Sequence, residues 1–248
     1  GMDRALQTKI VAKLFAHMAA GTTDVAPAEM YQPATAYTDK AQAAAEREAL
    51  FKRLPLIACL STELPGAYDF VTVDLAGVPA LIVRQADRSL KAFTNVCRHR
   101  GSKVETAERG NRKLFVCPFH AWSYDGAGAL RAMPFAEGFC GMDRKDRGLN
   151  ALPVEERHGL VWVVPTVGAR IDVAAHLGAE LDHVLTGWGL DGYVYERHQK
   201  FDVPVNWKLL VDGFMEDYHL PILHKDTIGP YFAPNLHTFA SYGLNACM

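Results

Sequence analysis

The sequence NVCRHRG at residues 95–101 and the sequence CPFHAWSYDG at residues 117–126 are the most informative stretches of this chain. Cys97 is followed two positions later by His99, and Cys117 is followed three positions later by His120. Chance would produce both spacings in a chain of this composition with odds of about 0.04. Seventeen residues separate the two pairs, which suits two loops that close around one metal centre.

Two thiolates and two imidazoles form a ligand set that suits either zinc or an iron–sulfur centre. A [2Fe–2S] cluster with two cysteines on one iron and two histidines on the other is the Rieske arrangement. Gly101, Pro118 and Gly126 suit loops that direct backbone N–H groups toward bridging sulfides. Two alternatives remain at this point. One is a structural zinc site with the same ligands, and the other is a pair of buried cysteines without any metal.

A second motif, NWKLLVDGFMEDYHLPILH, occupies residues 206–224. Its pattern predicts a helix over residues 206–219, in which Glu216 and His219 share a face. Asp212 would lie two turns before His219 on the same stripe, and Asp217 would point away. We expect Pro221 to end the helix, so that His224 can fold back toward His219. Two imidazoles and a carboxylate match a mononuclear non-haem iron site; the alternative is an amphipathic helix followed by a loop histidine.

Both motifs resemble the cluster loops and the iron-binding segment of Rieske non-haem iron oxygenases, the family of aromatic-ring-hydroxylating dioxygenase alpha subunits. The resemblance covers roughly residues 38–225 and favours iron–sulfur over zinc. It implies an α+β fold, in which an all-β Rieske domain is inserted into a helix-grip-like catalytic domain that is incomplete here. The implied segments are 1–54 (N-terminal helical part of the catalytic domain), 55–166 (Rieske domain) and 167–248 (partial catalytic domain).

The resemblance also implies a role for each matching residue. Cys97, His99, Cys117 and His120 would bind the cluster, while His219 and His224 would bind the mononuclear iron. Glu216 matches the acidic residue that bridges a cluster histidine and an iron histidine, and Asp212 matches a polar residue lining the site. The family is typically a trimer, in which His120 of one subunit faces Glu216 and His219 of the next. A carboxylate between two imidazoles would orient both rings.

The chain departs from the family in one respect that affects the site. The third iron ligand of the family is a carboxylate far downstream of the two histidines, but here Asp226 is the one acidic residue after His224. We therefore expect an intact cluster and an incomplete mononuclear site, in what is a fragment or a shortened homologue.

Periodicity predicts helices at residues 6–18, 39–53 and 172–185, the first with Leu6, Ile10, Leu14 and Met18 on one face. Short β-rich runs with turns between them fill residues 56–165. The examples that we expect as strands are Phe70–Leu75, Ala80–Arg84, Lys91–Val96, Lys113–Val116 and Gly159–Val164. Residues 193–205 also read as β-like, residues 22–38 as a loop, and the tail from residue 222 onward has no clear pattern.

Composition places the chain among ordinary globular proteins, with 49% hydrophobic residues and a formal net charge of −2. That charge gives no reason to expect nucleic acid or an anionic membrane as a partner. Five scattered cysteines argue against a disulfide scaffold and favour a reducing cytoplasm. The remaining histidines and cysteines are not expected to be ligands; they are His17, His158, His176, His183, His198, His237, Cys59, Cys140 and Cys247.

Three functions are compatible with these patterns. The first is the terminal oxygenase of a multi-component system, in which a reductase or ferredoxin passes electrons from NAD(P)H and O2 is used to hydroxylate, dihydroxylate or demethylate a small organic substrate. A glutamate at the bridging position, here Glu216, resembles the residue found in family members that act on quaternary ammonium compounds. Aromatic acids or hydrocarbons are equally possible substrates. The second is a Rieske ferredoxin-like electron carrier, and the third is a zinc-stabilised binding module.

Overall fold

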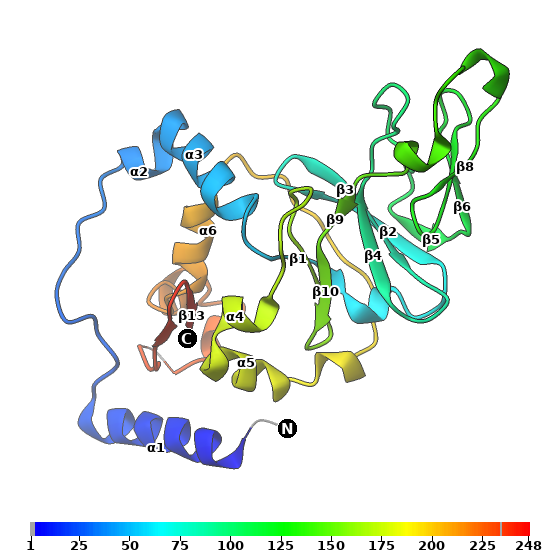
Figure 1. Cartoon of the computed structure of the whole chain (residues 1–248). Helices are drawn as coiled ribbons and strands as arrows, with labels where there is room; N and C mark the ends of the chain where they lie inside the picture. Colours follow the sequence, from blue (N-terminus) through cyan, green and yellow to red (C-terminus); the bar gives the residue numbers. More distant parts are fainter. Residues whose placement is uncertain (1–2, 234) are drawn as a thin grey trace. The chain divides into compact units, whose positions relative to one another are not determined.

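The computed structural model describes residues 3–233 and 235–248 (Figure 1), and they form two compact units. One unit, here called the β unit, comprises residues 45–176 and 189–197. The other, here called the helical unit, comprises residues up to 44 together with 177–188 and 198–248. The predicted α+β composition, with an all-β domain between helical segments, is confirmed.

The β unit contains three antiparallel sheets. The first has the order β1-β11-β10, the second β5-β2-β3-β4-β9, and the third β6-β7-β8. Their bounds are β1 Leu56–Leu60, β2 Asp69–Leu75, β3 Val78–Arg84, β4 Leu90–Thr94, β5 Arg109–Asn111, β6 Leu114–Val116, β7 Ser123–Asp125, β8 Leu130–Ala132, β9 Ala151–Leu152, β10 Val154–Arg157 and β11 Leu160–Val163.

The five-stranded sheet contributes to two hydrophobic cores because side chains alternate between the faces of a strand. On β3, Leu81 and Val83 join the core that includes Phe115 and Tyr124 of the three-stranded sheet β6-β7-β8. The intervening residues Ala80 and Ile82 join the core that contains Val161 and Val163 of β11. All the residues of β3 named here are fully buried. The alternation therefore anchors the sheet β6-β7-β8 on one face of the five-stranded sheet and the sheet with β1 on the other.

The remaining elements are helices, short turns and one hairpin. The α-helices are α1 Arg4–Ala20, α2 Thr35–Thr38, α3 Lys40–Glu46, α4 Val173–Leu177, α5 Ala179–Thr186, α6 Trp207–Phe214 and α7 Leu220–Leu223, and the hairpin is β12 Ala240–Tyr242 with β13 Asn245–Cys247. A π-helical turn, η1 Arg47–Phe51, continues α3, and 3-10 turns are η2 Ser61–Glu63, η3 Ala136–Gly138, η4 Arg144–Arg147, η5 Leu190–Gly192 and η6 Gly229–Tyr231.

Helix α1 matches the predicted helix but buries none of its described residues. Leu6, Ile10 and Leu14 are half-buried, whereas Met18 is 59% exposed. The predicted 172–185 helix is two helices, because Gly178 adopts a positive φ of 75° between α4 and α5. All five strands that were expected exist, with ends shifted by up to two residues.

Three expectations about the C-terminal third are wrong. Residues 193–205 contain no strand, since no neighbouring strand pairs with them. The predicted 206–219 helix ends at Phe214, where Met215 leaves the helical region. Pro221 lies in the first turn of α7, where a proline needs no N–H partner, so it begins a helix rather than ending one. The tail also contains the β12–β13 hairpin.

Among the described residues, no helix combines the length and apolar character needed to cross a bilayer.

Candidate metal centres

Two loops of the β unit present the four predicted cluster ligands, and both loops close in the same way. In the first, Cys97 N donates to Ser102 O at 2.8 Å, and Gly101 N donates to Cys97 O at 3.0 Å. In the second, Cys117 N donates to Trp122 O at 2.9 Å, and Ala121 N donates to Cys117 O at 2.9 Å. Each cysteine is thus held through both backbone groups by residues four and five positions later.

In both loops, the residue four positions after the cysteine has a left-handed backbone. Gly101 has a φ of 79° and Ala121 has a φ of 57°. Glycine adopts this conformation freely, whereas alanine is strained in it by about 1 kcal/mol. The second loop accepts that strain, which indicates that the surrounding bonds determine its shape.

The loops bring the four donor side chains together. Cys97 and Cys117 are 3% and 2% exposed, and their thiols are close enough to interact. The rings of His99 and His120 have centroids 4.6 Å apart. Nδ1 of His99 is buried and has no hydrogen-bond partner among the described residues, as expected of a nitrogen that binds iron. Two cysteines and two histidines at this spacing fit a [2Fe–2S] cluster.

No group of three or more His, Cys, Asp or Glu side chains that could hold a single metal ion occurs in residues 3–233 and 235–248.

Burial adjusts the proton affinity of these groups. It raises the pKa of the Cys97 thiol, although a hydrogen bond from Tyr124 opposes this. Burial, with smaller effects from His120 and Arg100, lowers the pKa of His99. The imidazole is therefore neutral near pH 7 and available as a ligand, while metal binding must remove the thiol proton.

Tyr124 connects the loops through its hydroxyl group. The tyrosine is fully buried, and its oxygen accepts the backbone N–H of Arg98 at 3.0 Å. The same hydroxyl lies 3.3 Å from Cys97 Sγ, where it can donate its proton to the cysteine thiolate. The sequence pattern gave no sign of this role, because a contact between residues 27 positions apart depends on the tertiary fold.

Aromatic rings cover the histidine side of the loops. Trp122 stacks on His99 with centroids 4.8 Å apart and planes at 9°, and Phe139 contacts both rings edge-on. A cavity of about 550 Å³ lies beside them, lined mainly by apolar side chains. Its rim includes Val116, Phe119 and Phe135, which are 47%, 59% and 80% exposed. An exposed apolar rim therefore lies beside the predicted cluster ligand His120.

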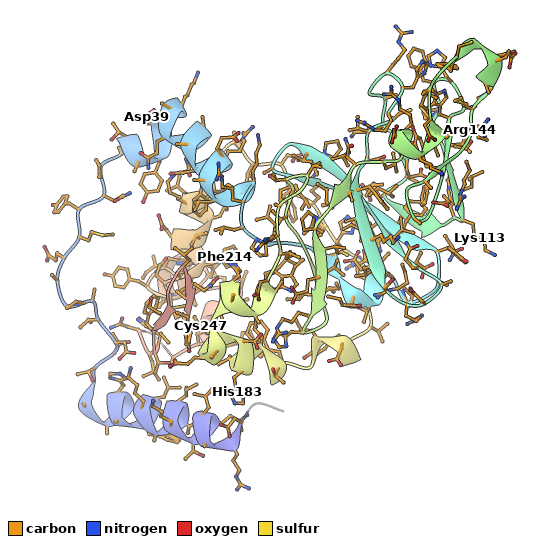
Figure 2. The ribbon with its side chains drawn as sticks, viewed as in Figure 1. Asp39, Lys113, Arg144, His183, Phe214 and Cys247 are labelled. Carbon is orange, nitrogen blue, oxygen red and sulfur yellow. The ribbon has the colours of Figure 1, made fainter. Side chains whose placement is uncertain are left out.

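The second motif lies in the helical unit. Asn206 caps α6 by accepting Lys208 N at 3.0 Å, and Phe214 at its last turn is 82% exposed (Figure 2). Beyond the helix, the carboxylate of Glu216 accepts the backbone N–H of His219 at 3.1 Å and also the Nδ1–H of the same residue. These bonds oppose burial and leave the pKa of Glu216 below its usual value. The Nε2 of His219 remains as the possible metal ligand.

His219 and His224 occupy the two ends of α7, and their ring centroids are 5.3 Å apart. Helix α7 therefore brings together the predicted iron ligands, as two of the three ligands that such a site needs. Asp226 is 85% exposed at its side chain. Asp212 instead accepts the hydroxyl of Tyr37 at 2.8 Å, which raises the pKa of Tyr37; its expected position on the stripe of His219 is wrong because α6 ends first.

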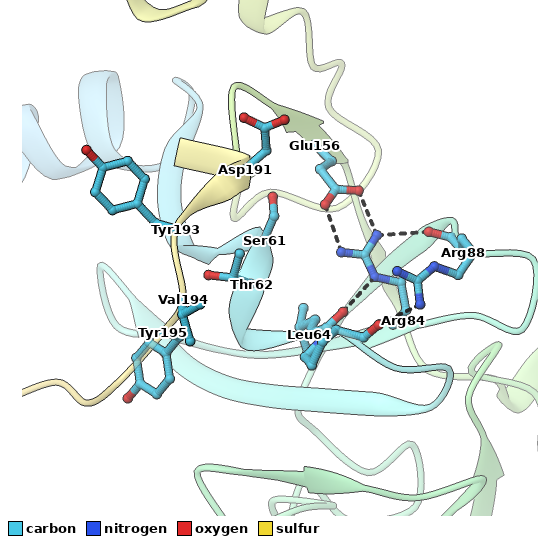
Figure 3. Close-up of a pocket in the computed structure, with 11 residues that line it drawn as sticks. Ser61, Thr62, Leu64, Arg84, Arg88, Glu156, Asp191, Tyr193, Val194 and Tyr195 are labelled. Carbon is cyan, nitrogen blue, oxygen red and sulfur yellow. Dashed lines mark hydrogen bonds and ion pairs between the residues drawn. The ribbon is translucent and has the colours of Figure 1, made fainter. Parts of the chain in front are cut away.

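A separate pocket of about 650 Å³ in the β unit contains none of the predicted site residues (Figure 3). At its base, buried Arg84 makes a two-pronged ion pair with Glu156, at 2.6 and 2.7 Å. Arg84 Nε also donates to Leu64 O at 3.1 Å. These bonds join β3 to β10, so we interpret the pair as structural.

Two family models match the chain. A Rieske [2Fe-2S] domain matches residues 55–153, and the catalytic domain of the ring hydroxylating alpha subunit matches residues 190–246. Biphenyl 2,3-dioxygenase subunit alpha of Rhodococcus jostii is 35% identical over 188 residues, which are 74% of this chain and 41% of the relative. Benzene 1,2-dioxygenase subunit alpha of Pseudomonas putida is 35% identical over 74% of this chain and 42% of its own length.

A solved structure extends the likeness to three dimensions. A quaternary ammonium Rieske monooxygenase, in complex with its substrate L-carnitine, superposes with a TM-score of 0.71 at 28% identity, covering 78% of this chain and 56% of that chain. The chain spans about two fifths of the length of the curated relatives that it matches.

Proposed function

Because this chain belongs to the family of Rieske ring-hydroxylating oxygenase alpha subunits, we propose that it acts as the terminal oxygenase component of a multi-component system. The Rieske domain implies a [2Fe–2S] cluster, and the catalytic domain of this family implies a mononuclear iron. A reductase or ferredoxin supplies electrons that originate from NAD(P)H, and O2 and an organic substrate are consumed.

One observation carries this proposal: a single chain holds both the paired Cys–His loops and the Glu216–His219–His224 segment. An electron carrier needs the loops alone. The second segment therefore supports an oxygenase over the Rieske ferredoxin-like alternative.

When bound, the two metal groups supply electron transfer and O2 activation; the protein supplies the environment for both. Cys97, His99, Cys117 and His120 would hold the cluster, and the Tyr124 hydroxyl would stabilise negative charge on Cys97 Sγ. Trp122 covers one face of the His99 ring. Glu216 retains the proton on Nδ1 of His219, which orients the Nε2 lone pair away from the carboxylate.

We further propose that the chain assembles as a trimer in which His120 of one subunit meets Glu216 of the next. The exposed apolar rim beside His120 supports such a contact. Oε1 of Glu216 is engaged by the side chain of His219 and Oε2 by its backbone N–H, but a carboxylate oxygen can accept a further hydrogen bond, here from His120 of the neighbouring subunit. Two substrate classes merit testing: aromatic rings, for which the curated relatives are named, and quaternary ammonium compounds, for which a solved relative is named.

The experiment that tests the proposal is the visible and reduced-state EPR spectrum of anaerobically purified protein, with iron and acid-labile sulfide counted per chain. A Rieske spectrum with two irons and two sulfides supports the cluster, and a third iron supports the mononuclear site. Cys117→Ser should abolish the spectrum, whereas Cys140→Ser, at an exposed cysteine, should preserve it. A colourless zinc protein would contradict the proposal.

Turnover is then measured with a ferredoxin–reductase pair and NADH, using biphenyl, benzene, L-carnitine and γ-butyrobetaine. Product that depends on His219 and not on the exposed His198 supports the oxygenase. Reversible reduction of the cluster without O2 consumption, in protein that contains the third iron, favours the electron carrier.

A further inference from the structure

Asp217 is a buried carboxylate immediately beside the predicted iron ligands. Among the described residues of the helical unit, it is the one charged residue that is buried, at 8% exposure. Burying a carboxylate is costly unless hydrogen bonds compensate it. Its Oδ1 lies 3.0 Å from Nδ1 of His237, which therefore donates a proton to it. The sequence pattern had placed Asp217 away from the site and His237 outside any role.

The partner His237 is fixed by a second set of bonds. Its N–H donates to Thr23 Oγ1 at 3.2 Å, and its carbonyl accepts the same hydroxyl at 3.3 Å. Two residues later, Phe239 N donates to Asp24 Oδ2 at 2.9 Å. Asp24 in turn contacts Lys13 and His17 of α1. His237 is therefore a junction between the segment after α1 and the segment before β12.

Asp217 also lies at the start of the turn that carries the histidines. Its carbonyl accepts Leu220 N at 3.1 Å, at the first residue of α7. The neighbouring Glu216 holds both the backbone and the ring of His219. Residues 215–219 have no regular secondary structure, so their conformation depends on such side-chain bonds.

From this arrangement we propose that Asp217 and His237 act together as positioning residues, which fix the turn at residues 216–219 and thereby preorganise His219 and His224 for iron. The proposal rests on the proposed function for the identity of the metal. It adds that metal affinity depends on a hydrogen bond to a residue 20 positions downstream. Loss of a group that bonds directly to a metal ligand weakens metal binding about 10- to 100-fold; because this pair acts through the turn, we expect the lower end of that range.

The test is calorimetric titration of the cluster-loaded chain with Co²⁺ alone, with the His219→Ala variant as the baseline for unrelated binding. Asp217→Ala and His237→Phe should each weaken Co²⁺ binding at least about tenfold, and the double variant should be no weaker than either single variant. Asp217→Asn keeps an acceptor, and His237→Asn keeps a donor near the position of Nδ1; both should restore binding to within about threefold of wild type. Asp202→Asn, at an exposed position, is the matched charge control and should have no effect.

Hydrogen–deuterium exchange provides a readout that does not require metal. The amides of His219 and Leu220 should exchange faster in Asp217→Ala and His237→Phe, while the cluster spectrum of the same samples stays unchanged. Wild-type affinity together with wild-type exchange in both variants would overturn the proposal, as would fully additive effects in the double variant. If the wild-type chain binds no Co²⁺ through His219, the mononuclear part of the proposed function fails, and exchange alone decides the role of Asp217 and His237.

Discussion

The hydroxyl of Tyr124 lies 3.3 Å from Sγ of Cys97 and accepts the backbone N–H of Arg98 at 3.0 Å. One buried side chain on β7 therefore bonds to both a predicted cluster ligand and the loop that presents it. A cluster-bound thiolate has no proton to donate, so the hydroxyl would be the donor to the sulfur in the loaded protein. Burial raises the pKa of Tyr124, and the hydrogen bond with Cys97 adds to this effect.

Replacing this tyrosine should change the redox behaviour of the cluster. A hydrogen bond to a sulfur ligand stabilises the reduced, more negative state, so Tyr124→Phe should lower the reduction potential. The shift is about 60 mV for each ~1.4 kcal/mol by which the bond favours the reduced state. The variant also leaves Arg98 N without its partner, which costs about 1–3 kcal/mol of folding stability.

An EPR-monitored redox titration measures the reduction potential of the cluster in Tyr124→Phe. Tyr193→Phe, at a tyrosine that is 61% exposed, is the control, and an unchanged potential in Tyr124→Phe would contradict the prediction.

The two loops should differ in how far exchange of glycine and alanine changes the free energy of unfolding. Gly101→Ala introduces a side chain at a φ of 79° with no atom within 4 Å of the new Cβ, so its cost is backbone strain alone. We expect a loss of about 1 kcal/mol in the free energy of unfolding. Ala121→Gly, at a φ of 57°, relieves strain but gains unfolded-state entropy, so the change should be within about 0.5 kcal/mol of zero. Urea unfolding monitored by the visible band measures both; a larger loss in Ala121→Gly than in Gly101→Ala would show that the loops are not equivalent.

Glu156 should make stability depend on pH. Hydrogen bonds from Arg84 hold the pKa of Glu156 below its usual value of 4.5, against the opposing effect of burial. A carboxyl whose pKa is lower in the folded state contributes stability above its unfolded pKa and loses it as the pH falls through the folded value. Glu156→Gln should therefore unfold more easily at pH 7, and the difference from wild type should shrink below about pH 4.5. The glutamate side chain is 37% exposed, so we expect a loss of about 1–3 kcal/mol, less than for a fully buried pair.

Urea midpoints of wild type and Glu156→Gln between pH 4 and 8 check this prediction. Glu48→Gln removes a pair with Lys52 whose glutamate is 63% exposed and should change the midpoint little. A constant difference between wild type and Glu156→Gln across this range would contradict the assigned pKa direction.

Alanine variants at two glycines would measure the stability cost of steric crowding separately from the cost of backbone strain. Gly159 has a φ of 72°, and a Cβ there would lie 2.4 Å from Asp191 N and 2.6 Å from Leu190 C. Gly168 has a φ of 77° and nothing within 4 Å. Gly168→Ala should cost about 1 kcal/mol, whereas Gly159→Ala should cost at least about 1–3 kcal/mol more, because backbone atoms must move. Thermal unfolding compares the two variants, and faster proteolysis near residue 190 in Gly159→Ala alone would identify the displaced segment. Equal melting temperatures of the two variants would contradict the predicted steric cost at Gly159.

Much of this protein could be predicted from local sequence. The spacing of Cys97, His99, Cys117 and His120 predicted one metal centre. Short β-rich runs bounded by turn residues located β3 and β11, because β-branched and aromatic residues favour strands. The His219–His224 spacing indicated a second site. The helix end at Phe214 could not be predicted from periodicity, since the apolar pattern continues past it and tertiary bonds decide where the chain turns.

Contacts between distant residues were decided by the tertiary structure alone. The bonds Tyr124–Cys97, Asp217–His237 and Arg84–Glu156 join residues 27, 20 and 72 positions apart. None has a local signature, because a hydroxyl, a carboxylate or a guanidinium reads as a surface group until folding removes it from water. Burial then makes a partner obligatory. The sequence by itself thus determined which residue types could bind metal, and the fold determined which neighbours hold them in place.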